Sequence, residues 1–201
     1  MKKIAIVMVL LMSVCIFAQN PFCNPSDIDD YRDGRCYETV QIGSQTWMAE
    51  NLTYRGNLAG KAWLLEHVPG YWKIAVFYTW RAAMNACPDD WHLPSVDEWE
   101  TLFEYVGGGG DGYGTAIKKL KTRGGWGSPR DDGNGTDDYG FHAAPVGMIY
   151  RDGSYMNNGG STHFWTSTSG KVADFPMASD YGGFNFFSID NGFSVRCVRD
   201  Y

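Results

Sequence analysis

The alternation of apolar and polar residues predicts strands toward both ends of the chain. Residues 37–49, YETVQIGSQTWMA, form two β-type runs around Gly43 and Ser44. Glycine at the first central position suits the type II′ turn of a tight hairpin. The pairs Asp-Gly at 152–153 and Asn-Gly at 191–192 are further hairpin signals. After the second pair, three apolar residues recur with a period of two and so share one face of a final strand: Phe193, Val195 and Cys197.

Between these strands the apolar spacing changes to that of a helix. Four residues at i, i+3, i+4 and i+7 form one stripe: Trp99, Leu102, Phe103 and Val106. Ser95 and Glu98 precede this stripe in the S-x-x-E arrangement of a capping box. The cap and the stripe together predict a helix over residues 96–106. A shorter alanine-rich helix is predicted over residues 79–87, where a proline ends it. Residues 115–122 suit a helical turn.

Two long stretches show neither the strand period of two nor the spacing of a helix. Residues 55–76 look like an insertion, and residues 107–140 are rich in glycine and aspartate. The order of strands, two short helices and strands predicts a single α+β domain with a small antiparallel sheet and long irregular loops. Long loops in a compact domain are usually functional or disordered, and tryptophans in these loops argue against disorder. We therefore expect ligand contact there, through three candidate rings: Trp63, Trp72 and Trp126.

The first 18 residues have the pattern of a secretory signal peptide. Lys2 and Lys3 precede a short apolar run, and Ala18 offers a small residue at the cleavage site. We expect the mature chain, residues 19–201, to form one exported domain. Cys15 raises the alternative of a lipid anchor, which the residues before it suit poorly. No later apolar run approaches the roughly 20 residues that a membrane span needs, so we expect no transmembrane segment.

Composition narrows the class of protein. The chain carries 17 basic and 23 acidic residues, a net charge of −6, and nucleic-acid binding would need clustered lysine and arginine. We therefore expect no nucleic-acid partner. The 25 glycines and the 15% aromatic content describe a turn-rich chain anchored by aromatic packing. Five tryptophans in the patterned segments are expected in the core: Trp47, Trp80, Trp91, Trp99 and Trp165.

Four cysteines follow the predicted signal peptide: Cys23, Cys36, Cys87 and Cys197. An even number in an exported chain predicts two disulfides, for which three pairings exist. The pairing that is local in sequence joins Cys23 to Cys36 and leaves Cys87 for Cys197. No C-x-x-C motif occurs, which argues against zinc or thioredoxin-like chemistry.

One acidic loop offers oxygen ligands of the kind that Ca²⁺ prefers. Its sequence DDGNGTDD supplies five candidates: Asp131, Asp132, Asn134, Asp137 and Asp138. The loop departs from the EF-hand pattern, because no glutamate stands at loop position 12. The preferred interpretation is a solvated turn and a protein without a cofactor, and a calcium site is the alternative.

The sequence contains no arrangement typical of catalysis. Asp97 and Glu98 already have structural roles in the first turn of the predicted helix, and no G-x-S-x-G motif occurs. Four scattered histidines lack a paired-ligand spacing such as H-E-x-x-H: His67, His92, His142 and His163. Of these, His92 suits a packed, hydrogen-bonded position. We expect a non-enzymatic protein.

Five segments together resemble the Fibrobacter succinogenes major paralogous domain: VQIGSQTWMAENLTY, YTWRAAMNACPDDWHLPSVDEWETL, DDYGFHAAPVGMIYRDGSYMNNGG, FWTSTS and GFSVRCVRD. They occur in the expected order and cover roughly residues 37–200. The resemblance implies an exported or surface protein of a Gram-negative bacterium, and it implies no particular activity.

The same segments look like a distant version of the C-type-lectin-like fold. That likeness implies one bridge from the first helix to the last strand, Cys87 to Cys197, and a second in an N-terminal hairpin, Cys23 to Cys36. The strings E-P-N, Q-P-D and W-N-D of calcium-dependent sugar sites do not occur. We expect a recognition or adhesion module that binds a glycan or a surface protein. The alternatives are a structural envelope component and an enzyme of the formylglycine-generating type, whose chemistry needs a reactive cysteine pair.

Overall fold

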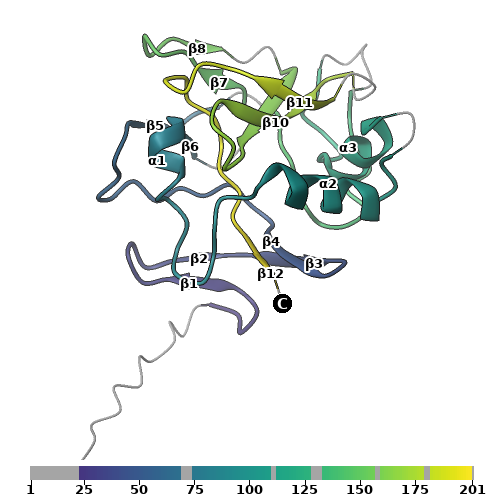
Figure 1. The fold of residues 1–201 in the computed structure, drawn as a ribbon, viewed down its shortest axis with the longest axis horizontal. Coiled ribbons are helices and arrows are strands. Elements are labelled where there is room, and N and C mark those ends of the chain that lie inside the picture. Colours follow the sequence, from purple (N-terminus) through teal and green to yellow (C-terminus); the bar gives the residue numbers. More distant parts are fainter. Residues whose placement is uncertain are drawn as a thin grey trace, which may run out of the picture.

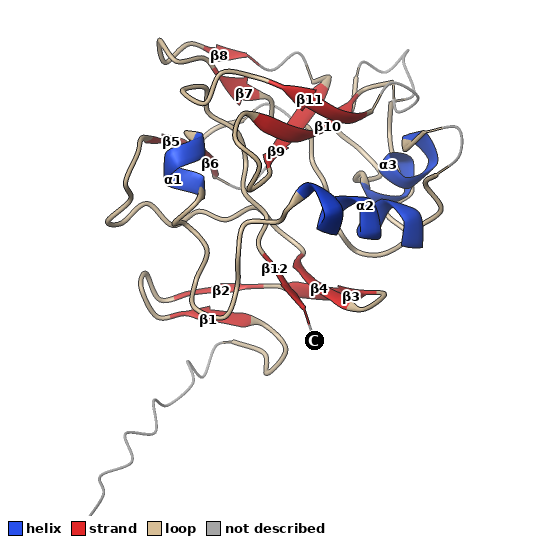
Figure 2. Ribbon diagram, viewed as in Figure 1, coloured by secondary structure: helices blue, strands red, loops and turns tan. Residues whose placement is uncertain are grey.

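The computed structural model describes residues 23–68, 74–109, 112–127, 133–156, 159–178 and 182–200. Within these ranges the chain forms small antiparallel sheets at two ends and three helices along the sides, joined by long loops (Figure 1, Figure 2). This mixture of helices and small antiparallel sheets confirms the predicted α+β class. No helix in the described ranges has the length and apolar character needed to cross a membrane.

One end of the molecule carries a three-stranded sheet in which strands from the N-terminal part of the chain pair with the C-terminal strand. β3 (Thr39–Ile42) and β4 (Gln45–Met48) form the predicted hairpin. Gly43 in its turn has φ +63°, a left-handed value that glycine adopts easily. β12 (Val198–Asp200) pairs with the other edge of β4. The central strand of this sheet is therefore β4.

An N-terminal hairpin lies at the same end of the molecule (Figure 1). β1 (Ile28–Asp30) pairs with β2 (Arg35–Tyr37), and the predicted disulfide between Cys23 and Cys36 is present, with Cα atoms 5.4 Å apart. This bridge closes the hairpin on itself and confirms the pairing that is local in sequence.

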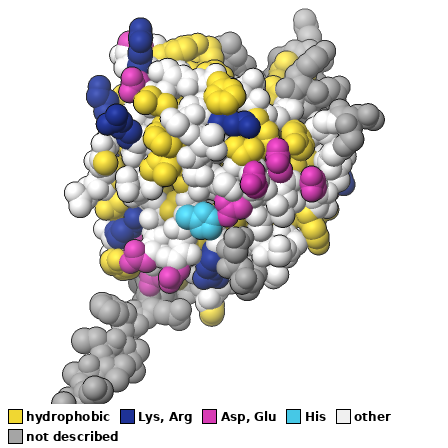
Figure 3. Space-filling model, viewed as in Figure 1, with side chains coloured by type: hydrophobic (Ala, Val, Ile, Leu, Met, Phe, Trp, Pro, Cys, Tyr) yellow, Lys and Arg dark blue, Asp and Glu magenta, His cyan; other side chains and the backbone are white. Residues whose placement is uncertain are grey.

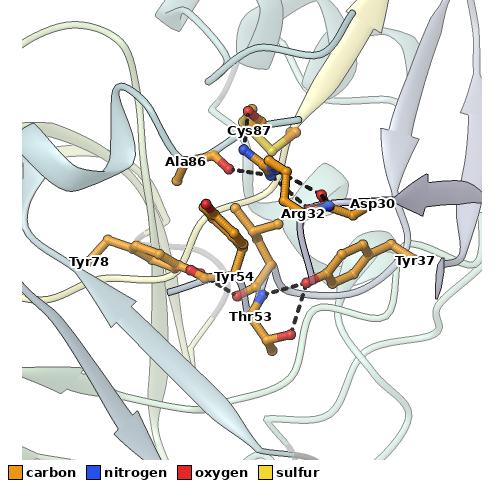
Figure 4. The surroundings of a disulfide bond; sticks show 10 residues. Asp30, Arg32, Tyr37, Thr53, Tyr54, Tyr78, Ala86 and Cys87 are labelled. Atoms are coloured by element: carbon orange, nitrogen blue, oxygen red, sulfur yellow. Dashed lines mark hydrogen bonds and ion pairs between the residues drawn. A yellow bond between two sulfur atoms is a disulfide. The ribbon is translucent and has the colours of Figure 1, made fainter. Parts of the chain in front are cut away.

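Arg32 fastens this hairpin to the rest of the domain (Figure 4). Its guanidinium donates to the carboxylate of Asp30 at 2.7 Å, and it also donates to the carbonyls of Ala86 at 2.8 Å and Cys87 at 3.0 Å. The guanidinium lies 4.0 Å from the centre of the Tyr54 ring. A cation that is paired, hydrogen-bonded and stacked in this way holds two distant segments together.

The opposite end of the molecule contains the other sheets. Their strands are β5 (Ala62–Leu65), β6 (Ala75–Tyr78), β7 (Met148–Ile149), β8 (Tyr155–Met156), β9 (Ser161–Trp165), β10 (Lys171–Pro176) and β11 (Gly183–Phe186). β5 pairs with β6 and β7 pairs with β8, while β10 lies between β9 and β11. The β7–β8 pair confirms the hairpin predicted from the Asp-Gly pair at 152–153.

Three helices are described: α1 (Trp80–Ala83), α2 (Val96–Tyr105) and α3 (Gly114–Leu120). The capping box of α2 is confirmed in both directions. The Glu98 amide donates to the Ser95 hydroxyl at 3.1 Å, and the Ser95 amide donates to the Glu98 carboxylate at 2.7 Å. α1 is shorter than predicted, and α3 lies where a helical turn was expected.

Two expectations are wrong: that residues 55–76 have no regular structure, and that the Asn-Gly pair at 191–192 forms a hairpin. Residues 55–76 contain β5 and part of its partner β6, with Trp63 opposite Phe77. Their sequences AWLL and AVFY are continuous apolar runs, so the alternation that marks a half-buried strand is missing. The Asn-Gly pair at 191–192 forms a turn without a hairpin, because β11 before it and β12 after it belong to different sheets.

An aromatic cluster beside α2 forms a large part of the core. Trp99 is fully buried and its ring lies near five others: Trp47, Phe103, Phe141, Phe164 and Phe175. Full burial of Trp47, Trp99 and Trp165 confirms their predicted core positions. Trp80 and Trp91 are half-buried and pack against a second cluster.

The last segment runs through this interior and presents different chemistry on its two sides. The predicted apolar face is confirmed, since all three residues are buried in one cluster: Phe193, Val195 and Cys197. Cys197 is bonded to Cys87 with Cα atoms 5.8 Å apart, as the resemblance implied. Arg196 is also buried, and it donates to the side-chain oxygen of Asn51 at 2.7 Å and to the backbone carbonyl of Met48 at 3.0 Å.

Candidate functional site

A pocket of about 560 Å³ opens where four chain segments meet. It is lined by residues before β5, at the start of α1, in the turn after β7 and in the turn that precedes Gly192: Gly60, Lys61, Thr79, Arg81, Arg151, Asp152 and Asp190. We call these seven residues the basic pocket. Figure 1 places α1, β5 and the β7–β8 turn on one side of the molecule, away from β3 and β12. The volume lies in the range of ordinary small-ligand sites.

Hydrogen bonds fix the first two segments against each other. Thr79 stands at the N-cap of α1, but its side chain makes no capping bond. Its hydroxyl instead accepts the Lys61 amide at 3.1 Å, and its own amide donates to the Lys61 carbonyl at 2.9 Å. The next amide, that of Trp80, donates to the carbonyl of Ile189 at 3.0 Å. The wall formed by α1 is therefore held on both sides.

The two turns are fixed in a similar way. The Arg151 amide donates to the side-chain oxygen of the buried Asn191 at 3.2 Å. Ile149 and Gly192 exchange backbone hydrogen bonds of 3.0 and 2.7 Å. Gly192 has no room for a larger residue, because a Cβ there would lie 2.9 Å from the Trp63 ring. The backbone around the pocket is thus tied together across segments that are far apart in sequence.

The side chains at the rim contrast with this fixed backbone. Lys61, Arg81 and Arg151 are exposed, and within the described residues their charged groups make no hydrogen bond and no ion pair. Figure 3 shows Lys and Arg side chains gathered on the side of α1 and the β7–β8 turn, while Asp and Glu side chains gather over α2. The pocket therefore presents unpaired cations in a chain whose net charge is negative.

Two carboxylates partly offset these cations. The hydroxyl of Ser154 donates to Asp152 at 2.6 Å and its amide at 2.9 Å, and these two hydrogen bonds hold the pKa of Asp152 below its usual value. Asp190 is the second carboxylate. Three cations against two anions leave a local excess of one positive charge. This arrangement favours an anionic ligand group that also carries hydrogen-bond donors.

The structure places the three predicted contact tryptophans differently. Trp63 is half-buried, packs beside Gly192 and lies next to the basic pocket. Trp126 is only 2% exposed, so its ring is buried and not available as a surface for the expected ligand contact. Its indole nitrogen donates to the Thr122 hydroxyl at 3.0 Å, and the Lys121 ammonium lies 4.0 Å from the ring centre. Trp72 lies outside the described residues.

The acidic loop is described only in part. Asp131 and Asp132 lie outside the described residues, and no group of three metal-binding side chains occurs within the described ranges. Asn134 accepts the Trp126 amide, the Asp137 carboxylate accepts the His142 amide at 2.9 Å, and Asp138 is exposed. Asn134 and Asp137 therefore already have protein partners, and the calcium site stays the untested alternative to a solvated turn.

The basic pocket was not predicted from the sequence. Its charged residues are spread from Lys61 to Asp190, and no local motif connects them. The Asp-Gly and Asn-Gly pairs next to two of its walls are hairpin signals, yet turn chemistry does not indicate which turns meet. Only the three-dimensional structure shows that these residues lie close together.

Comparison with known proteins gives one result. No curated protein and no solved structure matches the chain. The family described as the Fibrobacter succinogenes major domain matches residues 40–199. That range includes every residue of the basic pocket and the disulfide between Cys87, which follows α1, and Cys197 in the last segment. The chain therefore belongs to the Fibrobacter succinogenes major domain family.

Proposed function

We propose that the chain is an exported, non-enzymatic recognition or adhesion module at the bacterial cell surface. The ligand is a glycan or a surface protein, and an anionic group of it binds in the basic pocket. The observation that carries this proposal is the set of three cations without a protein partner among the described residues: Lys61, Arg81 and Arg151. Guanidinium and ammonium groups bind carboxylate, sulfate or phosphate through charge-assisted hydrogen bonds.

The fixed backbone around the pocket supports recognition over a purely structural role. Binding residues are often carried on loops that a rigid scaffold holds. The bonds of Thr79 to Lys61 and of Asn191 to Arg151 supply such a scaffold. A preorganised site loses less conformational freedom when it binds. Trp63 remains the candidate aromatic contact beside the pocket, and a structural envelope component is the alternative function.

The finer fold assignment and the location belong to the same proposal. We infer a C-type-lectin-like arrangement because both disulfides join the cysteines that this resemblance pairs. Export is supported by the signal-peptide pattern of residues 1–18 and by the two disulfides, which persist in oxidising compartments. A lipid anchor at Cys15 is the less favoured form of attachment. The formylglycine-generating alternative is disfavoured because Cys23, Cys36, Cys87 and Cys197 are all bonded.

A polysaccharide and glycan array with the protein comprising residues 19–201 tests this function. We expect saturable binding to acidic polymers, weaker binding to neutral ones, and a loss of affinity as salt is raised. Arg81→Ala and Arg151→Ala should each weaken binding by about tenfold or more, as removal of a charge-assisted contact does.

Arg123→Ala is the matched control, because Arg123 is also exposed and lies outside the basic pocket. It should bind like the wild type. Equal binding by all three variants would reject the pocket as the site. Absence of saturable binding to any glycan or surface protein would favour the structural envelope role.

A further inference from the structure

A second pocket, of about 410 Å³, lies between the N-terminal segment and the sheet of β3, β4 and β12. Its polar and aromatic lining includes Asp27, Thr39, Gln41, Thr46, Trp91 and Arg199. We call it the sheet groove. It shares no lining residue with the basic pocket, and Figure 1 places its sheet at the other end of the molecule from β7 and β8.

Three of these residues form a row across the sheet. Thr46 on the central strand lies opposite Gln41 on one side and opposite Arg199 on the other. Neighbouring strands are about 4.8 Å apart. An amide, a hydroxyl and a guanidinium are therefore lined up over roughly 10 Å, which is about the size of one sugar residue with its substituents.

Thr46 carries an unused hydrogen-bonding group. The residue is 5% exposed, and its hydroxyl oxygen is buried without a hydrogen-bond partner in the described part of the chain. A buried hydroxyl without a partner is costly, and such groups are rare in folded proteins. Because the backbone of β4 pairs with strands on both edges, the side chain is what Thr46 offers to the groove. A ligand oxygen would supply the missing partner.

Arg199 provides a positioned cation beside this hydroxyl. Its guanidinium carbon lies 4.9 Å from the centre of the Trp91 ring. Stacking on an aromatic ring restricts the guanidinium without using its N–H donors. Within the described residues the guanidinium makes no ion pair and no hydrogen bond. Its donors match the two oxygens of a carboxylate, which guanidinium groups bind in a bidentate manner.

The remaining side chains of the groove favour a ligand that carries hydroxyl groups over a ligand that carries a second strong negative charge. Gln41 donates to the Gly43 carbonyl at 3.3 Å and keeps its side-chain oxygen as an acceptor. The Asp27 carboxylate, which accepts from the Asn24 side chain at 2.9 Å, would repel a doubly charged phosphate. We infer that the sheet groove is a second ligand site for an acidic sugar. Its carboxylate binds Arg199, and its hydroxyl groups bind Thr46 and Gln41.

Titration of the protein comprising residues 19–201 with sodium glucuronate, followed by amide NMR shifts, tests this site. We expect saturable shifts at Gln41, Thr46 and Arg199. Glucose and acetate each carry half of the proposed chemistry, and each should bind at least about tenfold more weakly. Equal binding of acetate would overturn the sugar assignment. Tighter binding of a short peptide through its terminal carboxylate would overturn it as well.

Two variants locate the contacts. Arg199→Gln should weaken glucuronate binding by about tenfold or more, and Thr46→Val by about three- to tenfold. Thr46→Val should not lower the melting temperature, because the hydroxyl it removes has no partner within the described part of the chain. Arg123→Gln and Thr115→Val, at exposed positions outside both pockets, are matched controls and should leave these shifts unchanged. Wild-type affinity of both groove variants, or shifts confined to the basic pocket with none at Gln41, Thr46 and Arg199, would reject the proposal.

Discussion

Five aromatic rings have their centres 4.6–6.0 Å from that of Trp99, and none of these rings reaches solvent. Around the basic pocket, the backbone is equally fixed, but Lys61, Arg81 and Arg151 extend without a partner among the described residues. Both regions lie within the range that the family matches. The two regions therefore differ in whether their side chains have partners among the described residues, while the backbone is fixed in both.

Two arginines, one in the core and one at the basic pocket, show the same difference within one residue type. Arg196 is 1% exposed and donates to Asn51, Met48 and His142, so its charge is used by the fold. Arg81 is exposed, and its guanidinium has no such partner among the residues that the structure describes. The difference between core and pocket is thus a difference in what each charge contacts. Substitutions and pH measurements test it, from the largest expected effect to the smallest.

Trp99→Ala should lower the free energy of unfolding by about 3–5 kcal/mol, because it removes a fully buried ring and leaves a cavity. Denaturant unfolding measures the change. Trp99→Phe is the control, since it keeps most of the packing and removes an indole nitrogen that has no partner within the described chain. It should cost less than half as much. A wild-type midpoint for Trp99→Ala would mean that this cluster is not the core.

Trp126→Ala should cost about 3 kcal/mol, since the ring is 2% exposed and packs with the core cluster of α2. Trp63→Ala should cost less, because Trp63 is half-buried. Thermal unfolding of both variants measures the difference. Near-native stability of Trp126→Ala together with lost ligand binding would return Trp126 to the ligand contacts.

Ser95→Ala should cost about 0.5–2 kcal/mol, because it removes the hydroxyl that accepts the Glu98 amide at the start of α2. Urea unfolding measures this loss. Ser95→Thr, which keeps a capping hydroxyl, should lose less. Ligand binding should be unaffected in both variants, and a selective loss of binding would show that this segment has a functional role beyond capping.

Stability should also depend on Glu98 as the pH falls. Burial opposes ionisation of Glu98, but the Ser95 amide and the His92 side chain outweigh it and hold its pKa below the usual value. The ionised carboxylate therefore stabilises the fold at pH values above the ordinary pKa of a glutamate. That stabilisation is lost as the pH falls through the lowered pKa of the folded state.

Unfolding of the wild type and of Glu98→Gln at several pH values measures this contribution. The difference in unfolding free energy between them should be largest near neutral pH and shrink in acid. A difference that stays constant with pH would contradict the assignment of the lowered pKa to Glu98.

Arg81→Ala and Arg151→Ala should change the free energy of unfolding by no more than about 0.5 kcal/mol, since exposed side chains without partners contribute little. Arg196→Ala is the matched substitution in the core and should cost several times as much, because it leaves buried carbonyls without a donor. Equal losses for Arg81 and Arg196 would break the comparison between pocket and core.

Short-range rules predicted much of the local structure. The capping box of α2 depends on two residues three positions apart, and the β3–β4 hairpin depends on the glycine in its turn. Such signals act within one or two turns of chain, so they can be recognised in a single sequence. The disulfide pairing needed more, because the even count of cysteines left three pairings possible until the resemblance selected one.

The sequence by itself determined the α+β class, the cap of α2, the apolar face of the last segment and the membership of the family that its motifs resemble. Tertiary structure alone decided that Trp126 is buried, that residues 191–192 turn without forming a hairpin, and that Lys61, Arg81 and Arg151 meet. Burial and proximity depend on contacts between distant segments, such as that of Arg196 with Asn51, 145 residues apart. No local spacing encodes such contacts, because they exist only once the chain has packed against itself.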